Sequence, residues 1–257
     1  MEEVKIILTG ACGRMGHAVL AAVSKEPKAT VIAGVDVTPD TSFVPLYHGI
    51  DEVARDIGAD VIVDFSHHTA TEGILNYAKA AGCAVIICTT GHTEDELKLI
   101  ADASKKIPVF RSGNMSLGIN LLTALVEKAA SVLTGFDIEI IEKHHNQKLD
   151  APSGTAIMLA DAAAAGTDYK PEYVYDRHSV RQKRGSTEIG IHSIRGGNIV
   201  GEHEVLFAGT NETVTLSHSA ASREVFAVGA VHAALFMKGK GAGLYSMKDV
   251  IESMIGE

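Results

Sequence analysis

The stretch VKIILTGACGRMG, residues 4–16, decides the fold of this chain. Its first part, Val4 to Leu8, is an apolar run of β-type residues, and the residues from His17 to Lys25 follow a helical pattern. The glycine-rich turn between the two therefore joins a strand to a helix. This order is typical of the first βα unit of a dinucleotide-binding domain.

Three glycines shape the turn, with the spacing G-x-x-G-x-x-G at Gly10, Gly13 and Gly16 rather than the commoner G-x-G-x-x-G. Glycine turns between a strand and a helix also occur simply for close packing, so the motif needs support from elsewhere. A second predicted strand, Thr30 to Val35, supplies it, because Asp36 at its end lies 20 residues beyond Gly16 (36 − 16). An acidic residue at that distance binds the adenosine ribose in dinucleotide-binding folds, so we predict a nicotinamide cofactor here.

Strands and helices alternate through the rest of the first half of the chain. We expect strands at residues 60–65, 84–89 and 108–111, and helices at 71–81 and 94–105. Such alternation implies a parallel sheet covered by helices on both faces.

The pattern changes after Asn114. A long helix at 117–133 and a strand at 137–142 lead to an Ala-rich helix through Ala165, and strands follow at 186–193, 201–208 and 212–219 before helical patterns return at 223–237 and 248–255. Gly and Asn turns between these strands indicate an antiparallel or mixed sheet. The sequence thus predicts an α/β fold, with an N-terminal Rossmann-type parallel sheet domain and a C-terminal α+β domain.

The cofactor site is expected to extend along the carboxyl ends of the parallel strands, where open α/β sheets bind ligands. The loops at residues 88–91 and 112–115, which follow two of these strands, would line the nicotinamide side. They can also be ordinary turns with Thr or Asn caps that bind no ligand. Val37 follows Asp36 and offers no charge for a 2′-phosphate, so NADH should bind at least as well as NADPH, while Arg14 leaves NADPH open. The residues expected to contact the cofactor are Gly10, Ala11, Cys12, Gly13, Arg14, Met15, Asp36, Cys88, Thr89, Thr90, Ser112, Gly113, Asn114 and Met115.

Composition bounds the possible functions. Of 257 residues, 46% are hydrophobic and 21% are charged, which is ordinary globular usage and argues against disorder. The net charge of −9 disfavours nonspecific nucleic-acid binding, which depends on a basic surface.

No apolar run approaches a membrane span, and a strand begins at once after the N-terminus, so we expect a cytoplasmic protein without a signal peptide. The three cysteines are odd in number and adjoin apolar runs, which predicts reduced thiols.

The most informative segment for chemistry is EKHHNQKLDAPSGTA, residues 142–156. Histidine titrates near neutrality, and Lys148 adds a second proton source with a positive charge. A helix start is predicted here, with Asp150 as N-cap and Pro152 in the first turn, and helix N-termini attract carboxylates and phosphates. Small, donor-rich residues then stand at the helix start: Ser153, Gly154 and Thr155. We therefore predict an acid site that faces an anion.

The charged residues of this segment also allow a plainer interpretation. His144 and His145 can be ordinary surface residues at a strand end, with Lys148 solvated. A metal site is not predicted, because adjacent strand residues point to opposite faces and no further ligands cluster nearby. Several basic side chains can line a positive cleft within an acidic protein; they are Lys143, Lys148, Arg181, Lys183, Arg184 and Arg195.

Taken together, these motifs resemble the 4-hydroxy-tetrahydrodipicolinate reductase (dihydrodipicolinate reductase) family of lysine and diaminopimelate biosynthesis. The resemblance covers nearly the whole chain, through GACGRMG, CTTG, GNMSLGIN, EKHHNQKLDAPSGTA, RGGNIVGEHEVLFAG, AASREVFAVGAV and GLYSMKDV. The HHNQKLDAPSGTA segment is highly specific to it. Two positions depart from the family pattern: Cys88 stands where glycine is usual, and Met115 where phenylalanine is common.

The resemblance implies an NADH- or NADPH-dependent oxidoreductase that reduces a ring imine bearing two carboxylates. His144 and Lys148 would be catalytic and supply the proton, while His145, Gly154 and Thr155 would bind the substrate. It also implies a dinucleotide-binding domain at 1–115 with 223–257, a substrate-binding and oligomerisation domain at 116–222, and hinges near 114–116 and 222–223. Domain closure on both ligands and a homotetramer are expected, with no nucleic-acid or membrane partner.

Two further functions stay open at this point. A dehydrogenase of another small acid shares the Rossmann half, but it does not account for the paired histidines with Lys148. A catalytically silent cofactor sensor on the same fold has no need of the acid.

Overall fold

The computed structural model describes residues 3–38 and 44–255, and the chain divides into two compact units. Unit 1 contains the residues up to Leu117 together with those from Arg223 onward, and unit 2 contains Gly118–Ser222. The first crossing falls at the start of the helix Leu117–Val132, and the second falls in the segment between the strand that ends at Ala220 and the helix that begins at Glu224. Each unit has its own sheet and core.

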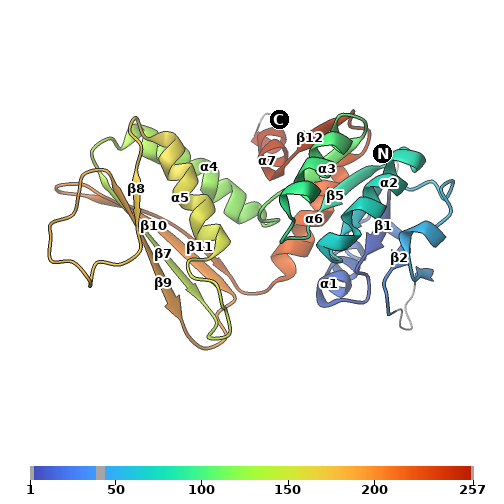
Figure 1. Cartoon of the computed structure of the whole chain (residues 1–257), viewed down its shortest axis with the longest axis horizontal. Helices are drawn as coiled ribbons and strands as arrows, with labels where there is room; N and C mark the ends of the chain where they lie inside the picture. Colours follow the sequence, from blue (N-terminus) through green and yellow to red (C-terminus); the bar gives the residue numbers. More distant parts are fainter. Residues whose placement is uncertain (1–2, 39–43, 256–257) are drawn as a thin grey trace. The chain divides into compact units, whose positions relative to one another are not determined.

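Unit 1 is built on a seven-stranded parallel sheet with the strand order β12-β6-β5-β4-β1-β2-β3 (Figure 1). The strands are β1 (Val4–Thr9), β2 (Ala29–Val35), β3 (Leu46–Tyr47), β4 (Val61–Asp64), β5 (Ala84–Ile87), β6 (Pro108–Arg111) and β12 (Gly243–Tyr245). The helices are α1 (Arg14–Val23), α2 (Thr71–Ala81), α3 (Glu94–Ser104), α6 (Glu224–Met237) and α7 (Met247–Ile255), with single 3-10 turns at Ile50–Glu52 and His68–Ala70. The chain order reverses between β1 and β4, which lie side by side.

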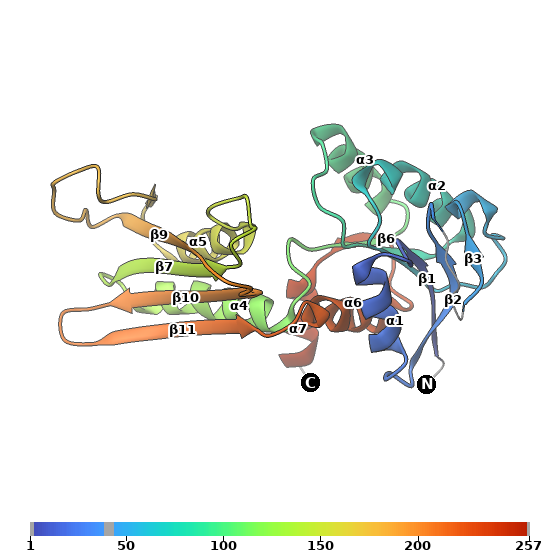
Figure 2. The ribbon, with the colours of Figure 1, turned by 90° about the horizontal axis from the view of Figure 1, so that it is seen from below.

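The core of unit 1 consists of two layers, one on each face of the sheet. In β1, Ile6 and Leu8 pack with residues of α1 and α6, whereas Ile7 packs with residues of α2 and α3. Figure 2 shows these helix pairs on opposite sides of the sheet. All three side chains are fully buried, which explains why a strand of a doubly covered parallel sheet is apolar without alternation.

Unit 2 is built on a five-stranded mixed sheet with the order β11-β10-β7-β9-β8. Its strands are β7 (Asp137–His144), β8 (Glu172–Val174), β9 (Glu188–Arg195), β10 (Gly201–Ala208) and β11 (Thr213–Ala220), and its helices are α4 (Leu117–Val132) and α5 (Gly154–Gly166). The central strand β7 runs parallel to β9 and antiparallel to β10. Ile138 and Ile140 of β7 face α4 and α5 and form one core with Val205 and Phe207 of β10.

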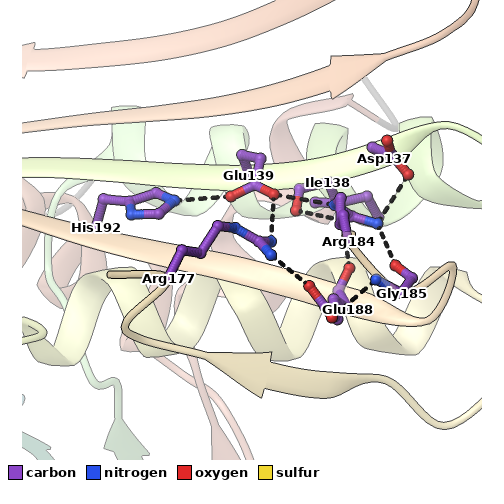
Figure 3. A network of polar contacts seen from close by, with 8 residues as sticks. All are labelled: Asp137, Ile138, Glu139, Arg177, Arg184, Gly185, Glu188 and His192. Carbon is purple, nitrogen blue, oxygen red and sulfur yellow. Dashed lines mark hydrogen bonds and ion pairs between the residues drawn. The ribbon is translucent and has the colours of Figure 1, made fainter. Parts of the chain in front are cut away.

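The opposite face of this sheet is not covered by a helix among the described residues (Figure 2). Charged side chains cover part of it instead (Figure 3). Arg184 donates to Asp137 at 2.8 Å, to Glu139 at 3.0 Å and to three backbone carbonyl groups. Arg177 joins Glu139 to Glu188, at 2.9 and 2.6 Å, and the network thereby fastens the loop before β9 onto β7.

The predicted fold class is confirmed, and the element ends differ from the predictions by a few residues, as element ends commonly do. The difference with most consequence is at β7, which was predicted to end at Glu142 and in fact continues to His144. The sequence did not predict β3, β8 and β12, because two or three residues are too few to show a period. None of the helices in the described part of the chain is long and apolar enough to cross a membrane.

Candidate active site

The glycine turn after β1 is shaped by close backbone approach at two of its three glycines. Gly10 has a φ of +73°, and a Cβ there would lie 2.5 Å from the carbonyl oxygen of Phe65. A Cβ at Gly16 would clash with the carbonyl oxygen of Gly10, because α1 packs directly against the turn. Gly13 is exposed and opens toward a cavity.

This cavity measures about 390 Å³ and lies within unit 1, at the carboxyl ends of β1 and β4. Gly10, Gly13 and Asp36 line it, facing Phe65, Ser66 and His67 from the loop after β4. The two oxygens of Asp36 accept the backbone N–H groups of Cys12 at 3.0 Å and Thr38 at 3.2 Å, so the carboxylate is fixed beside the glycine turn. A ligand is expected here on general grounds, since open α/β sheets bind at the point where the strand order reverses.

Asp64 connects the ends of three central strands at the same edge of the sheet. Its carboxylate is buried and accepts the Thr9 hydroxyl at 2.6 Å, the Ser66 backbone N–H at 3.0 Å and the Thr89 hydroxyl. Thr89, predicted to line the nicotinamide side, is therefore held in place by a carboxylate from the neighbouring strand.

The remaining residues predicted to contact the cofactor lie in the same turn and loops but differ in exposure. The side chains of Ala11 and Met115 are buried in the core, so only their backbones can face a ligand. Arg14, Thr90 and Gly113 are exposed, and the others are half-buried: Cys12, Met15, Cys88, Ser112 and Asn114.

The predicted acid site lies in unit 2, at the carboxyl end of β7, and its centre is the fully buried carboxylate of Glu142. Arg195 of β9 donates to both carboxylate oxygens at 2.7 Å. His144 Nδ1 lies 2.6 Å from one oxygen, and the Ser153 backbone N–H donates to the other at 3.1 Å. Burial raises the pKa of Glu142, but the hydrogen bonds from Arg195 and His144 outweigh it and bring the pKa down to about 2.

The state of His144 follows from this carboxylate. Because Glu142 is ionised it can only accept, so Nδ1 of His144 carries the proton that they share. Nε2 is then the nitrogen left for a ligand, and a Cβ added at Gly201 would lie 3.1 Å from it. Burial lowers the pKa of His144, Glu142 opposes this, and the charges of Lys148 and Arg195 lower the pKa further.

Lys148 lies in the loop that follows β7, where its Nζ is 2.8 Å from Oδ1 of Asp150. Its backbone N–H donates to the carbonyl oxygen of His145, so a tight turn joins the predicted substrate contact His145 to Lys148. Arg195 donates at 2.7 Å to the backbone carbonyl of Asp150 and so holds the far end of the loop.

The prediction that Asp150 caps the next helix is wrong. The N-cap of α5 is Ser153, whose Oγ accepts the backbone N–H of Ala156 at 3.2 Å, and the helix begins at Gly154. Pro152 therefore precedes the cap instead of standing in the first turn, and it follows a cis peptide bond. Asp and Ser are equally good caps by propensity, and here the buried acceptor Glu142 fixes the backbone of Ser153.

The N-terminus of α5 presents the two remaining predicted substrate contacts. Gly154 is exposed, and a Cβ built on it would meet nothing within 4 Å. Thr155 is half-buried beside it. The N–H groups of a first helical turn point away from the helix and carry a partial positive charge, so this end is suited to an anion.

His203 of β10 lies behind this helix start. It is 5% exposed, its Nε2 is 3.2 Å from Oγ of Ser153, and its ring centre is 5.2 Å from that of His144. Burial and the charge of His144 lower the pKa of His203 to about 4, so the ring is neutral at neutral pH. It acts as a support for Ser153 rather than as a second acid.

Four of the six basic residues that could line a positive cleft pair with carboxylates, among them Lys148 with Asp150. Lys143 pairs with Glu202 at 3.0 Å, Arg184 binds Asp137 and Glu139, and Arg195 binds Glu142. These pairs reduce the positive charge that such a cleft would have, while Arg181 and Lys183 are exposed in the loop before β9. No set of three His, Cys, Asp or Glu side chains suited to a metal ion occurs within residues 3–38 and 44–255.

Two family descriptions match this chain: "Dihydrodipicolinate reductase, N-terminus" over residues 4–115 and "Dihydrodipicolinate reductase, C-terminus" over residues 118–251. The chain belongs to the dihydrodipicolinate reductase family. A relative named 4-hydroxy-tetrahydrodipicolinate reductase, from Caldanaerobacter subterraneus subsp. tengcongensis, is 51% identical over 249 residues, which are 97% of this chain and 98% of the relative. A relative of the same name from Clostridium botulinum is 46% identical over 250 residues, covering 96% and 98%.

A solved structure supports the fold of this family member. Dipicolinate-bound dihydrodipicolinate reductase from Paenisporosarcina sp. TG-14 superposes with a TM-score of 0.80 over 96% of this chain and 99% of that chain, at 23% sequence identity. Membership of a named reductase family with a Rossmann-like first unit makes this chain an NAD(P)H-dependent oxidoreductase.

Sequence reasoning about this family member missed the buried residues behind the predicted acid site. Glu142 carried a usable signal, because residues two apart on a strand share a face and Glu142 stands two before His144. Arg195 was indicated only as a basic residue and His203 not at all, since their contacts with Glu142 and Ser153 depend on how β9 and β10 pair with β7.

Proposed function

We propose that this chain reduces 4-hydroxy-tetrahydrodipicolinate with NADH or NADPH, as a step of lysine biosynthesis by the diaminopimelate route. One observation carries the proposal: in a member of this reductase family, an imidazole held by a buried carboxylate stands at the same end of the sheet as an open helix N-terminus. A proton source and an anion site are what the reduction of a dicarboxylate ring requires.

The substrate carboxylates would bind at the start of α5. Gly154 and Thr155 would donate there, Lys148 would add its positive charge and His145 would complete the contact. The open space in front of Gly154 supports this assignment, because a carboxylate needs room to approach the backbone. The dipicolinate-bound dihydrodipicolinate reductase from Paenisporosarcina sp. TG-14 holds a planar dicarboxylate, which is consistent with a small dicarboxylate substrate here.

His144 and Lys148 would supply the proton. In the free protein the lowered pKa keeps the imidazole mainly neutral, with Nδ1 protonated toward Glu142. Two substrate carboxylates near the ring would favour its charged form, so Nε2 would gain a proton as the substrate binds and pass it to the reduced ring. A general acid of this kind contributes about two to four powers of ten in rate.

The cavity at β1 and β4 fits the nicotinamide dinucleotide expected in unit 1. Gly10 and Gly13 would let the pyrophosphate approach the backbone, and Asp36 would accept from the adenosine ribose. When bound, the cofactor supplies a hydride through its nicotinamide ring. Val37 follows Asp36 and is 83% exposed, and its side chain offers no positive charge to the 2′-phosphate of NADPH. NADH should therefore bind at least as well as NADPH.

The assembly proposed for the chain is a cytoplasmic homotetramer formed through unit 2. The sheet face without a covering helix supports it, since this face includes the half-buried side chains of Ile141 and Leu206. Sedimentation equilibrium should then give four times the chain mass of 27.1 kDa, and a monomer would reject the assembly.

Oxidation of NADH and NADPH by the purified chain tests the activity. We expect oxidation when the cyclic imine is supplied and none with a panel of keto acids; activity on a keto acid alone would reject the proposal in favour of another dehydrogenase. His144→Ala should lose turnover and still bind NADH, because its site lies in unit 2 and the cavity lies in unit 1. A variant that turns over normally would remove His144 from the reaction.

A further inference from the structure

Behind His144 lies a buried ion pair, Glu142 with Arg195, to which the proposed function assigns no role toward the substrate. Glu142 is 0% exposed and Arg195 is 20% exposed at their side chains. Withdrawing both charges from water costs several kcal/mol per ion, and the ion pair regains this only with good geometry and further hydrogen bonds. A buried pair is thus weak evidence for stability, and such perturbed groups cluster at functional sites.

The carboxylate of Glu142 accepts at least two donors at each oxygen, and Ser193 of β9 adds a further side-chain hydrogen bond to it. Oε1 accepts from Arg195 Nη2 and from the Ser153 backbone, and Oε2 accepts from Arg195 Nη1 and from His144 Nδ1. One carboxylate therefore binds the imidazole and the start of α5 at once.

We propose that Glu142, held by Arg195, is a positioning residue that keeps the proton of His144 on Nδ1, leaves Nε2 for the substrate, and fixes the N-terminus of α5 relative to that nitrogen. The part of this proposal that concerns the substrate rests on the proposed function, whereas the tautomer of His144 does not depend on it.

The substitution Glu142→Gln separates charge from shape. The NH2 group would face a nitrogen of Arg195 in either orientation. Its single oxygen would nevertheless occupy the Oε1 position, because the Ser153 backbone N–H at Oε1 can only donate, whereas His144 Nδ1 at Oε2 can accept in its other tautomer. The amide NH2 would then face His144 Nδ1, which must accept. The ring proton would move to Nε2, the nitrogen that the substrate requires.

The charges around the ring predict the direction of the pH effect. Glu142 of β7 is the anion in contact with it, Lys148 of the loop and Arg195 of β9 are cations, and His203 of β10 is neutral. Without the Glu142 charge only the cations remain, so protonated His144 is disfavoured. The alkaline limb of the activity profile, where the general acid loses its proton, should therefore move to lower pH.

Glu139 provides a matched control on the same strand. It also accepts from arginines, Arg177 and Arg184, and lies 2.7 Å from the Nε2 of a histidine, His192, but on the opposite face of β7 (Figure 3). Glu139→Gln removes the same kind of contact three residues away.

Nitrogen NMR of ¹⁵N-histidine-labelled protein decides the tautomer, with the His144 signals assigned from a His144→Gln variant. We expect Nδ1–H in the wild type and in Glu142→Asp, which retains the anion, Nε2–H in Glu142→Gln, and the wild-type state in Glu139→Gln. The turnover number of Glu142→Gln should fall about 10- to 100-fold, as for other residues that orient a functional histidine.

The wild-type spectrum tests the proposal even if a variant fails to fold, because an Nε2–H tautomer in the unsubstituted protein would overturn it. An unchanged tautomer and pH profile in folded Glu142→Gln would overturn it as well. If the tautomers behave as expected but the imine is not reduced, the proposed function fails and the positioning role stands.

Discussion

Replacing Arg195 by methionine should convert a neutral buried pair into a lone buried charge. The guanidinium makes four hydrogen bonds, two to the oxygens of Glu142 and two to the backbone carbonyls of Asp150 and Ile194, all at 2.7 or 2.8 Å. Methionine keeps much of the apolar stem and removes every donor. Breaking a buried pair on one side costs about 3–5 kcal/mol, against a total stability of about 5–15 kcal/mol for a typical domain.

The pH dependence of this loss has a definite sign. In the wild type the folded pKa of Glu142, about 2, is below its unfolded value, so the pair stabilises the fold above the unfolded pKa and this contribution is lost as the pH falls toward 2. Without Arg195, burial dominates and raises the pKa of Glu142. The folded variant then binds the extra proton, and its deficit should shrink as the pH is lowered from about 7 to about 5.

Urea unfolding at these two pH values, monitored by hydrogen exchange of peptides from β7 and β9, measures the loss of stability in unit 2 and its dependence on pH. Lys143→Met is the control, because Lys143 lies on β7 next to Glu142 and pairs with Glu202 while both side chains are 38% exposed, and exposed pairs contribute about 0–1 kcal/mol. A loss below about 1 kcal/mol for Arg195→Met, or an equal loss at both pH values, would refute the reasoning.

Three further predictions concern the proposed reaction. Lys148→Ala should lower the turnover number and raise the KM for the imine, whereas His145→Ala should mainly raise KM; steady-state rates near wild type in both would contradict their roles. Gly201→Ala places a Cβ against His144 Nε2 and should lower turnover at least 10-fold with little change in NADH affinity, which fluorescence titration can check. Asp36→Ala should weaken NADH more than NADPH, and equal weakening would show that the carboxylate does not contact the ribose.

Much of the fold could be predicted from short-range patterns. The run Val4 to Leu8 followed by glycines predicts a βα unit because apolar residues on both faces of a strand imply a doubly covered sheet. Helix α2 and strand β6 occur at the predicted residues, 71–81 and 108–111. The short edge strands could not be predicted, since pairing with a neighbour, and no period of their own, makes them strands.

The candidate site divides in the same way. His144, Lys148 and the donors at Gly154 and Thr155 are close in sequence, so one segment indicates them together. Their supporting residues come from other strands, and Arg195 is 53 residues away from Glu142. The helix start was misplaced for the same reason: local propensity accepts Asp150 or Ser153, and a distant ion pair decides between them.

Glu139 and Glu142, whose carboxylates lie on opposite faces of β7, also restrict how this strand can align during folding. A slip by one residue would turn Glu139 and Lys143 into the apolar core and expose Ile138 and Ile140. A slip by two residues would return the apolar side chains to the core face, but it would separate Glu139 from Arg177 and Arg184 and Glu142 from Arg195. An unpaired charge would then remain on each face of the strand. Misaligned hairpins and sheets are therefore penalised twice, and the central strand of unit 2 tolerates a single alignment.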